Sequence, residues 1–172
     1  MAGLTLNIFN KHADRVKMAN IAQAVNVLQS VILTDGDKMV KTPTYYVFKM
    51  YKEHQNNTLI GSYITTPSID SKCDEKSFPQ LIESASMDNN GVIYATITNT
   101  SYQNASEIKC QVADTAVESI SAEILTGQYN QYNDFGNENS IKTEKFEDFT
   151  KCDDGFTAVI PPCSVVKFVI EK

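Results

Sequence analysis

The sequence of 172 residues lacks any long apolar run. A helix that crosses a bilayer needs about 20 predominantly apolar residues. The best candidate, residues 27–33, has only the length of a strand and contains Gln29 and Ser30. This excludes a membrane-spanning helix, and we expect no membrane partner.

Basic residues are few and scattered. The chain has 15 Lys and Arg against 21 Asp and Glu, which gives a formal net charge of -6. A protein that binds nucleic acid gathers basic residues in a stripe or patch. We therefore expect no nucleic-acid partner, and we interpret the mild acidity as a contribution to solubility.

Metal-binding and secretory patterns are missing too. The four cysteines are Cys73, Cys110, Cys152 and Cys163; no two have the C-x-x-C spacing, and no histidine lies near them. We therefore expect no metal and no cofactor, with free thiols favoured over disulfides. Met1 is followed by an amphipathic segment rather than by the charged and apolar regions of a secretory signal, so we expect a cytoplasmic protein.

What is present is an ordinary globular composition, with 42% hydrophobic and 21% charged residues. Two patterns meet near Asn56. Residues 2–26 have the apolar spacing of a helix, and residues 27–33 read as a continuous, buried strand of the parallel type. A turn signal follows at residues 34–37, and Thr42 and Pro43 are an N-cap and a first helical residue for a second helix. This order is typical of an α/β unit.

A lone α/β unit cannot bury both faces of a parallel strand. The first part of the chain therefore has the pattern of the end of a larger α/β domain. The strand at residues 27–33 would keep unpaired backbone groups and exposed apolar faces. It could dock on the second part of the chain, pair with another copy or become partly disordered, and we expect self-association.

After Asn56 the sequence changes to short runs of alternating apolar and polar residues. These runs cover residues 91–98, 107–112, 119–125, 156–160 and 165–170. Turn signals at residues 89–91 and 153–155 and the prolines at 161 and 162 separate some of them. The pattern predicts an antiparallel sandwich or barrel. The residues expected to face its core are Ile93, Ala95, Ile97, Ile120, Ile124, Phe168 and Ile170.

Several motifs carry a family resemblance. Between residues 9 and 55 stand HADRV, MANIAQAVNVL and TPTYYVFKMY, and later come AEILTGQYNQYNDFGNE and IPPCSVVKFVI. Together they resemble the C-terminal part of the α-L-arabinofuranosidases of glycoside hydrolase family 51. The resemblance covers nearly the whole chain and is least distinctive over residues 61–86.

The resemblance implies a mainly β fold in two parts. Residues 1–55 would be the last helix–strand–helix unit of a (β/α)8 catalytic barrel, and residues 56–172 a C-terminal antiparallel, jelly-roll-like β-sandwich. The implied partners are the missing N-terminal barrel, an arabinose-containing oligosaccharide in the intact enzyme and further copies of the chain in a homo-oligomer.

The resemblance also implies an activity for the whole enzyme. Family members remove terminal α-L-arabinofuranosyl residues from arabinose-containing polysaccharides and oligosaccharides with retention, using two carboxyl groups about 5 Å apart. Both glutamates follow earlier barrel strands, so we expect no catalytic residue in this chain and no activity of the chain alone. Glu138 lies in a Gly-Asn-Glu sequence like that of the family's acid/base, but it follows no barrel strand and is expected to be a solvated loop residue.

The loop after the eighth barrel strand is the segment expected to reach the substrate, because barrel active sites form at the carboxyl ends of the strands. This makes Thr34, Asp35 and Thr42 the substrate-proximal candidates. Thr42 stands where some family members have a glutamine, and the alternative role of its hydroxyl is an N-cap. His54 should end a helix and, with a partial positive charge, interact favourably with the helix dipole.

Two other interpretations remain open at the level of sequence. An independent carbohydrate-binding sandwich would use exposed aromatic residues; the chain has no tryptophan, but Tyr129, Tyr132 and Phe135 share one asparagine-rich segment. The chain could also be a purely structural or assembly domain, and fold alone does not decide among these functions.

Overall fold

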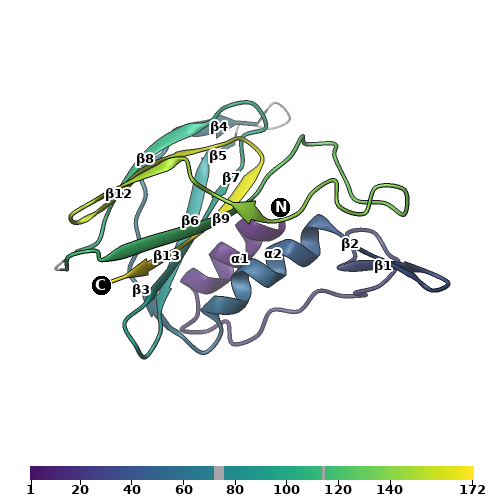
Figure 1. The fold of residues 1–172 in the computed structure, drawn as a ribbon, viewed down its shortest axis with the longest axis horizontal. Helices are drawn as coiled ribbons and strands as arrows, with labels where there is room; N and C mark the ends of the chain where they lie inside the picture. Colours follow the sequence, from purple (N-terminus) through teal and green to yellow (C-terminus); the bar gives the residue numbers. More distant parts are fainter. Residues whose placement is uncertain (72–75, 114) are drawn as a thin grey trace.

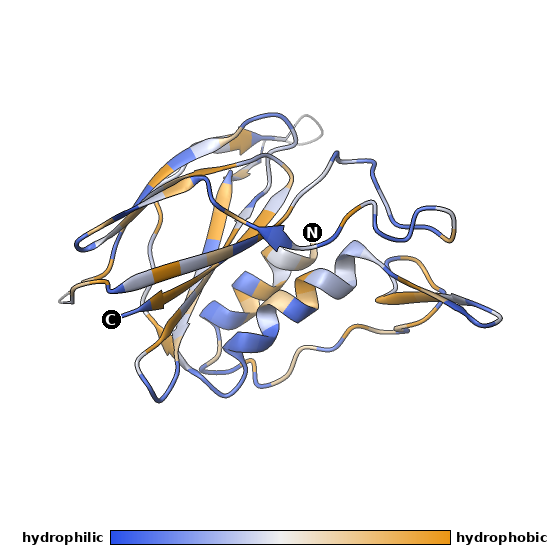
Figure 2. Ribbon diagram, in the orientation of Figure 1, coloured by the Kyte–Doolittle hydropathy of each residue, from blue (hydrophilic) through white to orange (hydrophobic). Residues whose placement is uncertain are grey.

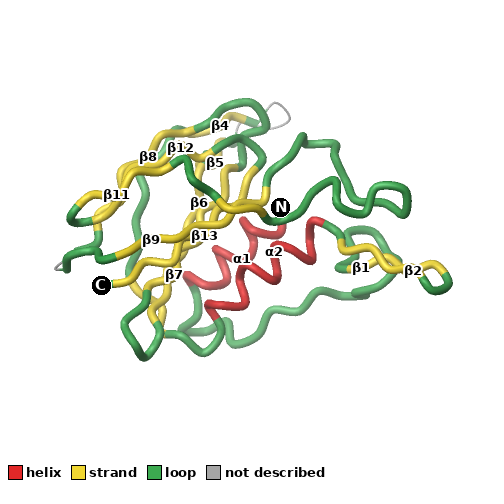
Figure 3. The backbone as a smooth tube through the Cα atoms, viewed as in Figure 1, coloured by secondary structure: helices red, strands yellow, loops and turns green. Residues whose placement is uncertain are grey.

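A computed structural model describes residues 1–71, 76–113 and 115–172. Cys73 lies outside the described residues. The fold is mainly β, as predicted: a large antiparallel sheet is covered on one face by two helices and on the other by a small sheet (Figure 1). Long loops connect the first helix to the first strand and the ninth strand to the tenth (Figure 3).

The large sheet has six strands. In spatial order they are β10 (Glu144–Lys145), β9 (Ser119–Leu125), β13 (Ser164–Glu171), β7 (Ile93–Asn99), β6 (Leu81–Met87) and β3 (Thr58–Ile60). Every neighbouring pair in it is antiparallel. Strand β13 lies between β9 and β7, so both of its edges are paired and it forms the centre of the sheet.

The small sheet consists of β11 (Phe149–Cys152), β12 (Gly155–Ile160) and β8 (Ser106–Gln111). The turn predicted at residues 153–155 connects β11 to β12, with Cys152 opposite Gly155. A separate pair is formed by β4 (Ser68–Asp70) and β5 (Ser77–Pro79). The antiparallel sandwich predicted from the alternating runs is therefore confirmed.

The core between the two sheets contains all seven residues predicted for it. Five are buried, and Ala95 and Ile120 are partly buried against them. Phenylalanines fill its centre: the rings of Phe156 and Phe168 stack with centroids 4.3 Å apart, and Phe146 and Phe149 meet Phe168 edge-on. Burial of such large apolar rings contributes strongly to the stability of the domain.

The opposite face of the large sheet is covered by α1 (Ala2–Lys11) and α2 (Pro43–Tyr51), and η1 (Lys52–His54) extends α2. The predicted start of α2 is confirmed, because Thr42 is its N-cap and Pro43 its first residue. Val47 and Met50 of α2 pack in one cluster with Val165 of the sheet. Of the outcomes considered for the first part of the chain, the structure shows docking on the sandwich for the two helices but not for residues 27–33, and association between copies stays a prediction.

The first helix is shorter than predicted. We expected it to span residues 2–26, but it ends at Lys11, and residues 12–31 contain no further helix or strand. An isolated helix is marginal in water, and most helical stability comes from packing of an apolar face. The helix is retained where Gly3 and Asn7 pack on the sheet, and it is lost where the apolar residues that follow have no such surface.

The prediction of a buried parallel strand at residues 27–33 is also wrong, both in the position of the strand and in its pairing. The strand β1 covers Ile32–Asp35 and pairs antiparallel with β2 (Lys38–Lys41) as a hairpin. Among the described residues, parallel pairing is limited to one bridge between Val25 and Ile32. A strand satisfies its backbone groups along its length with a neighbouring strand, whereas in residues 27–31 the backbone-to-backbone bonds to other segments are confined to Val31, with Ala24 and Thr42.

A buried polar seam joins α1 to the large sheet. The side-chain amide of Asn7 donates to the carbonyl oxygen of Ile82 at 2.8 Å, and its oxygen accepts from the hydroxyls of Ser84 and Thr96, both at 2.8 Å. Gly3 allows the close approach, since a β-carbon there would lie 2.7 Å from Oγ1 of Thr98. The sheet is therefore buried on both faces: the face toward the small sheet is apolar, and the face toward the helices combines this polar network with the apolar cluster of Val47, Met50 and Val165.

His54 closes the other end of this seam. Its two ring nitrogens lie 2.8 Å from Oγ of Ser86 and 3.1 Å from Oγ1 of Thr96. Burial, together with the charge of Lys167, lowers the pKa of His54 to about 4. The imidazole is thus neutral at pH 7, and the expectation that a positive charge at His54 interacts with the helix dipole is wrong because burial disfavours the charged form.

Candidate functional site

The substrate-proximal candidates Thr34 and Asp35 lie on the β1–β2 hairpin, which projects beyond the N-terminal end of α2 (Figure 1). Its strand β1 begins with the apolar residues Ile32 and Leu33 (Figure 2). Thr34 is held by Asn26, whose side-chain oxygen accepts from the Thr34 backbone N–H at 2.7 Å. Asp35 is exposed and faces Lys38 across the turn, where Gly36 has a φ of +58°. The hairpin thus presents two exposed carboxylates near its tip, those of Asp35 and Asp37.

Thr42 is placed differently from the other two candidates. Its hydroxyl donates toward the carbonyl oxygens of Ser30 and Val31, at 2.6 and 3.1 Å, and accepts from the backbone N–H of Tyr45 at 3.4 Å. These contacts close the base of the hairpin and cap α2. The hydroxyl is therefore engaged within the chain, as the N-cap alternative expected.

A second element lies beside the hairpin: the loop between β9 and β10, residues 126–143, which we name the asparagine loop. Its anchor is Asn133, whose side-chain nitrogen donates to the carbonyl oxygens of Lys41 and Ile141, both at 2.7 Å. The side-chain oxygen of Asn133 accepts from the backbone N–H of Ile141, also at 2.7 Å. Every strong hydrogen-bonding group of this buried amide is used, which fixes the loop to the last residue of the hairpin.

The three aromatic residues of the asparagine loop do not form one platform. Tyr129 is exposed and meets Tyr102 edge-on at 6.0 Å between centroids, whereas Phe135 is half-buried. Tyr132 remains exposed beside polar residues of the loop. Sequence reasoning missed Tyr102 and Asn133, because the contacts of both depend on segments distant in the sequence.

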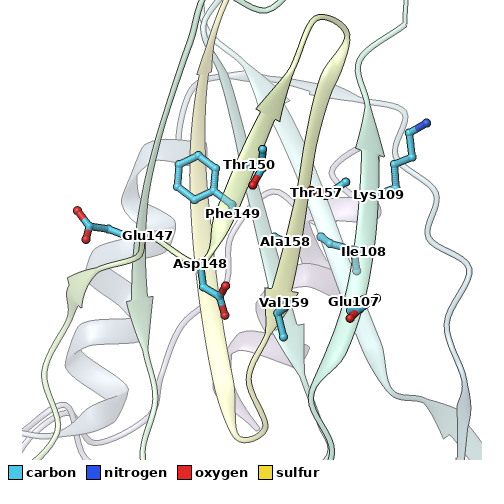
Figure 4. Close-up of a pocket in the computed structure, with 10 residues that line it drawn as sticks. All are labelled: Glu107, Ile108, Lys109, Glu147, Asp148, Phe149, Thr150, Thr157, Ala158 and Val159. Carbon is cyan, nitrogen blue, oxygen red and sulfur yellow. The ribbon is translucent and has the colours of Figure 1, made fainter.

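Glu138 and three acidic residues of the small sheet region are the described carboxylates that bear on a hydrolytic site. Glu138 is exposed in the asparagine loop, as expected. A hollow of about 610 Å³ at the small sheet contains Glu107, Glu147 and Asp148, but Figure 4 shows these three side chains spread along it rather than converging. A hydrogen bond from Lys145 lowers the pKa of Glu147, which favours its ionised form.

Among the described residues, no group of three or more His, Cys, Asp or Glu side chains could hold a metal ion. The three described cysteines, Cys110, Cys152 and Cys163, are free and half-buried. Burial raises the pKa of the Cys110 thiol, which disfavours the reactive thiolate.

Exposed apolar side chains gather in the first 39 residues. Leu28 is 95% exposed and Met18 76% exposed, and Val25 and Met39 of the same region are exposed as well. Single exposed apolar residues are ordinary, but a group of this kind along one segment is typical of an interaction surface. We name residues 12–39, from the end of α1 to the β2 strand, the apolar segment.

Comparison with known proteins identifies the family. The family described as "Alpha-L-arabinofuranosidase C-terminal domain" matches residues 1–164. The chain belongs to this family. The resemblance to the C-terminal part of the family 51 arabinofuranosidases, found from the motifs, is thereby confirmed.

Individual relatives of this arabinofuranosidase C-terminal domain support the family assignment. An intracellular exo-α-L-arabinofuranosidase of Bacteroides ovatus is 40% identical over 99% of the chain and 33% of its own length. The family 51 arabinofuranosidase structure from Xanthomonas axonopodis pv. citri matches with a TM-score of 0.92 at 33% identity, over 99% of the chain and 34% of that protein. The arabinose complex of the Thermotoga maritima enzyme shares the fold, with a TM-score of 0.84 at 22% identity over 99% of the chain and 37% of that protein.

The domain therefore spans about a third of the length of these relatives. The described residues include no helix that is long and apolar enough to cross a membrane.

Proposed function

We propose that the chain is the C-terminal part of a retaining α-L-arabinofuranosidase and that it supports a catalytic barrel formed by a longer protein. The observation that carries this proposal is the apolar segment, which exposes Met18, Leu28 and Met39 to water in the isolated chain. A neighbouring barrel would bury these side chains and supply strand partners to residues 27–31.

The same proposal assigns a separate role to each of the two parts of the chain. Residues 1–55 would complete the barrel as its last α/β unit, and residues 56–172 would form the sandwich that braces it. The hairpin would then lie near the substrate, with Thr34 and Asp35 within reach of the sugar. Thr42 would act indirectly, since its hydroxyl closes the base of the hairpin.

The substrates of the whole enzyme would be terminal α-L-arabinofuranosyl residues of arabinose-containing polysaccharides and oligosaccharides. The name of the Bacteroides ovatus relative, an intracellular exo-α-L-arabinofuranosidase, supports this substrate class and a cytoplasmic location. We also propose that the isolated chain forms a homo-oligomer, because the apolar segment, when no barrel covers it, favours pairing between copies.

The chain alone should not hydrolyse p-nitrophenyl α-L-arabinofuranoside. Retaining hydrolysis needs a nucleophile and a proton donor about 5 Å apart, and removing such a pair lowers the rate by many orders of magnitude. The assay measures release of p-nitrophenol by the purified chain and by the Glu138→Gln variant. Turnover that survives repurification and disappears in Glu138→Gln would show that the chain carries its own acid and would refute the proposal.

A further inference from the structure

We propose that the asparagine loop carries a sugar-binding subsite, built on Tyr132, Asp134 and Asn137, that holds one residue of an arabinose-containing oligosaccharide. This deepens the proposed function, which supplies the substrate class, and it assigns a direct role in substrate contact to the sandwich half of the chain.

The shape and composition of the loop suit a small, hydroxyl-rich ligand. The hollow has a volume of about 310 Å³ and is lined by Gln131, Tyr132, Asp134, Gly136, Asn137 and Ser140. This volume lies at the lower end of the range of ligand pockets. The ring of Tyr132, 66% exposed, offers an apolar face to the C–H groups of a sugar, and the remaining lining is polar or has no side chain.

The polar groups divide into those that shape the hollow and those left for a ligand. Gln131 is fully used, because its oxygen accepts from the backbone N–H of Gln128 and its nitrogen donates to Ser140. One oxygen of Asp134 accepts from the backbone N–H of Phe135 at 2.6 Å, which leaves the second carboxylate oxygen as an acceptor. The exposed amide of Asn137 adds a donor and an acceptor. A sugar hydroxyl both donates and accepts, so this set is complementary to it.

The loop is already fixed in place before a ligand binds. The backbone groups of Asp134 and Asn137 bond to each other at 2.8 and 3.3 Å, which closes the turn between them. Asn133 ties the adjacent residue to Lys41 and Ile141 with three bonds of 2.7 Å. A preorganised loop loses little conformational entropy on binding, which favours measurable affinity for a small ligand.

The position of the hollow points to a subsite of the oligosaccharide rather than to an unrelated ligand. The bond from Asn133 to Lys41 places the neighbouring Tyr132 near the base of the hairpin, whose strand β1 carries Thr34 and Asp35 toward the tip. The asparagine loop and the hairpin also project from the same end of the molecule (Figure 1). A chain of sugar residues that passes the hairpin can therefore continue over Tyr132.

Titration of the ¹⁵N-labelled chain with arabinotriose, followed by chemical-shift changes, tests this inference. The expected result is saturable binding at millimolar concentration, with the largest changes at Tyr132, Asp134 and Asn137. Tyr132→Ala should weaken binding at least 10-fold, and Asn137→Ala should weaken it to a smaller extent.

Two matched controls make the test specific. Tyr63→Ala removes an 89% exposed tyrosine outside the asparagine loop, and Asn130→Ala removes an exposed asparagine of the same loop that does not line the hollow. Both should bind like the parent chain. Absence of saturable binding, or an equal loss in Tyr132→Ala and Tyr63→Ala, would overturn the subsite. Neither result would affect the proposed support of the barrel, because that role requires no sugar binding by this chain.

Discussion

Replacing Phe168 by alanine is expected to lower the free energy of unfolding by about 3–5 kcal/mol. The ring is fully buried on the central strand β13 and touches the rings of Phe146, Phe149 and Phe156. Its removal leaves a cavity at the point where both sheets meet, so the loss includes both transfer and cavity terms. Because a domain of this size has a total stability of about 5–15 kcal/mol, the variant should be close to unfolding.

Urea unfolding followed by circular dichroism measures this effect, and Phe78→Ala is the matched control. Phe78 lies on the small β4–β5 pair and is 40% exposed, so its truncation should cost less than about 1 kcal/mol. Phe168→Leu, which refills most of the volume, should recover part of the loss. Equal midpoints for Phe168→Ala and Phe78→Ala would show that the two sheets do not enclose the core described above.

Acidification should destabilise the chain through His54. In the folded state burial lowers its pKa to about 4, whereas an unfolded histidine has its ordinary pKa of 6.5. Below pH 6.5 the unfolded state therefore binds the additional proton, and stability falls as the pH decreases from 6.5 to 4. The expected contribution over this window is about 3 kcal/mol, and it is absent above pH 6.5.

The variant His54→Gln isolates this contribution from the titration of the carboxylates. It should be less stable than the parent at pH 7, because it cannot reach both Ser86 and Thr96, but its stability should fall less steeply between pH 6.5 and 4. His12→Gln, at an exposed histidine, is the control and should follow the parent profile. Parallel profiles for His54→Gln and the parent would mean that the imidazole is not buried between the helix and the sheet.

The strands of the sandwich were predictable where apolar and polar residues alternate. The run at residues 119–125 coincides with β9, and those that contain Ile97 and Phe168 differ from β7 and β13 by one or two residues at their ends. Strand β6 was missed. Its sequence, Leu-Ile-Glu-Ser-Ala-Ser-Met, has serines on the face that packs against α1, so its burial pattern is not apolar alternation.

The failures in the first part of the chain share one physical cause. The helix beyond Lys11 and the strand at residues 27–33 were predicted from apolar periodicity, which indicates what a segment can bury but not whether a surface exists to bury it. Among the described residues of this first part, only α1 and α2 pack their buried side chains on the large sheet. The N-cap at Thr42 was predictable because capping depends on neighbouring residues alone.

The candidate site was predictable to a lesser degree than the fold. Thr34 and Asp35 follow from the family resemblance, and their role near a substrate remains a prediction. The link from Asn133 to Lys41 joins residues 92 positions apart, and no local pattern indicates it. The same limit applies to the polar seam, in which Asn7 meets Thr96 across 89 positions.

Replacement of the last third of the Bacteroides ovatus relative by this chain tests the central claim most directly. The relative's N-terminal part, about two thirds of its length, is assayed alone and fused to residues 1–172, with p-nitrophenyl α-L-arabinofuranoside as substrate. If the chain supplies the support and the last unit of the barrel, the fusion will fold and hydrolyse the substrate, whereas the truncated part will be insoluble or inactive. A truncated part as stable and active as the native relative, or a folded fusion without activity, would contradict the account.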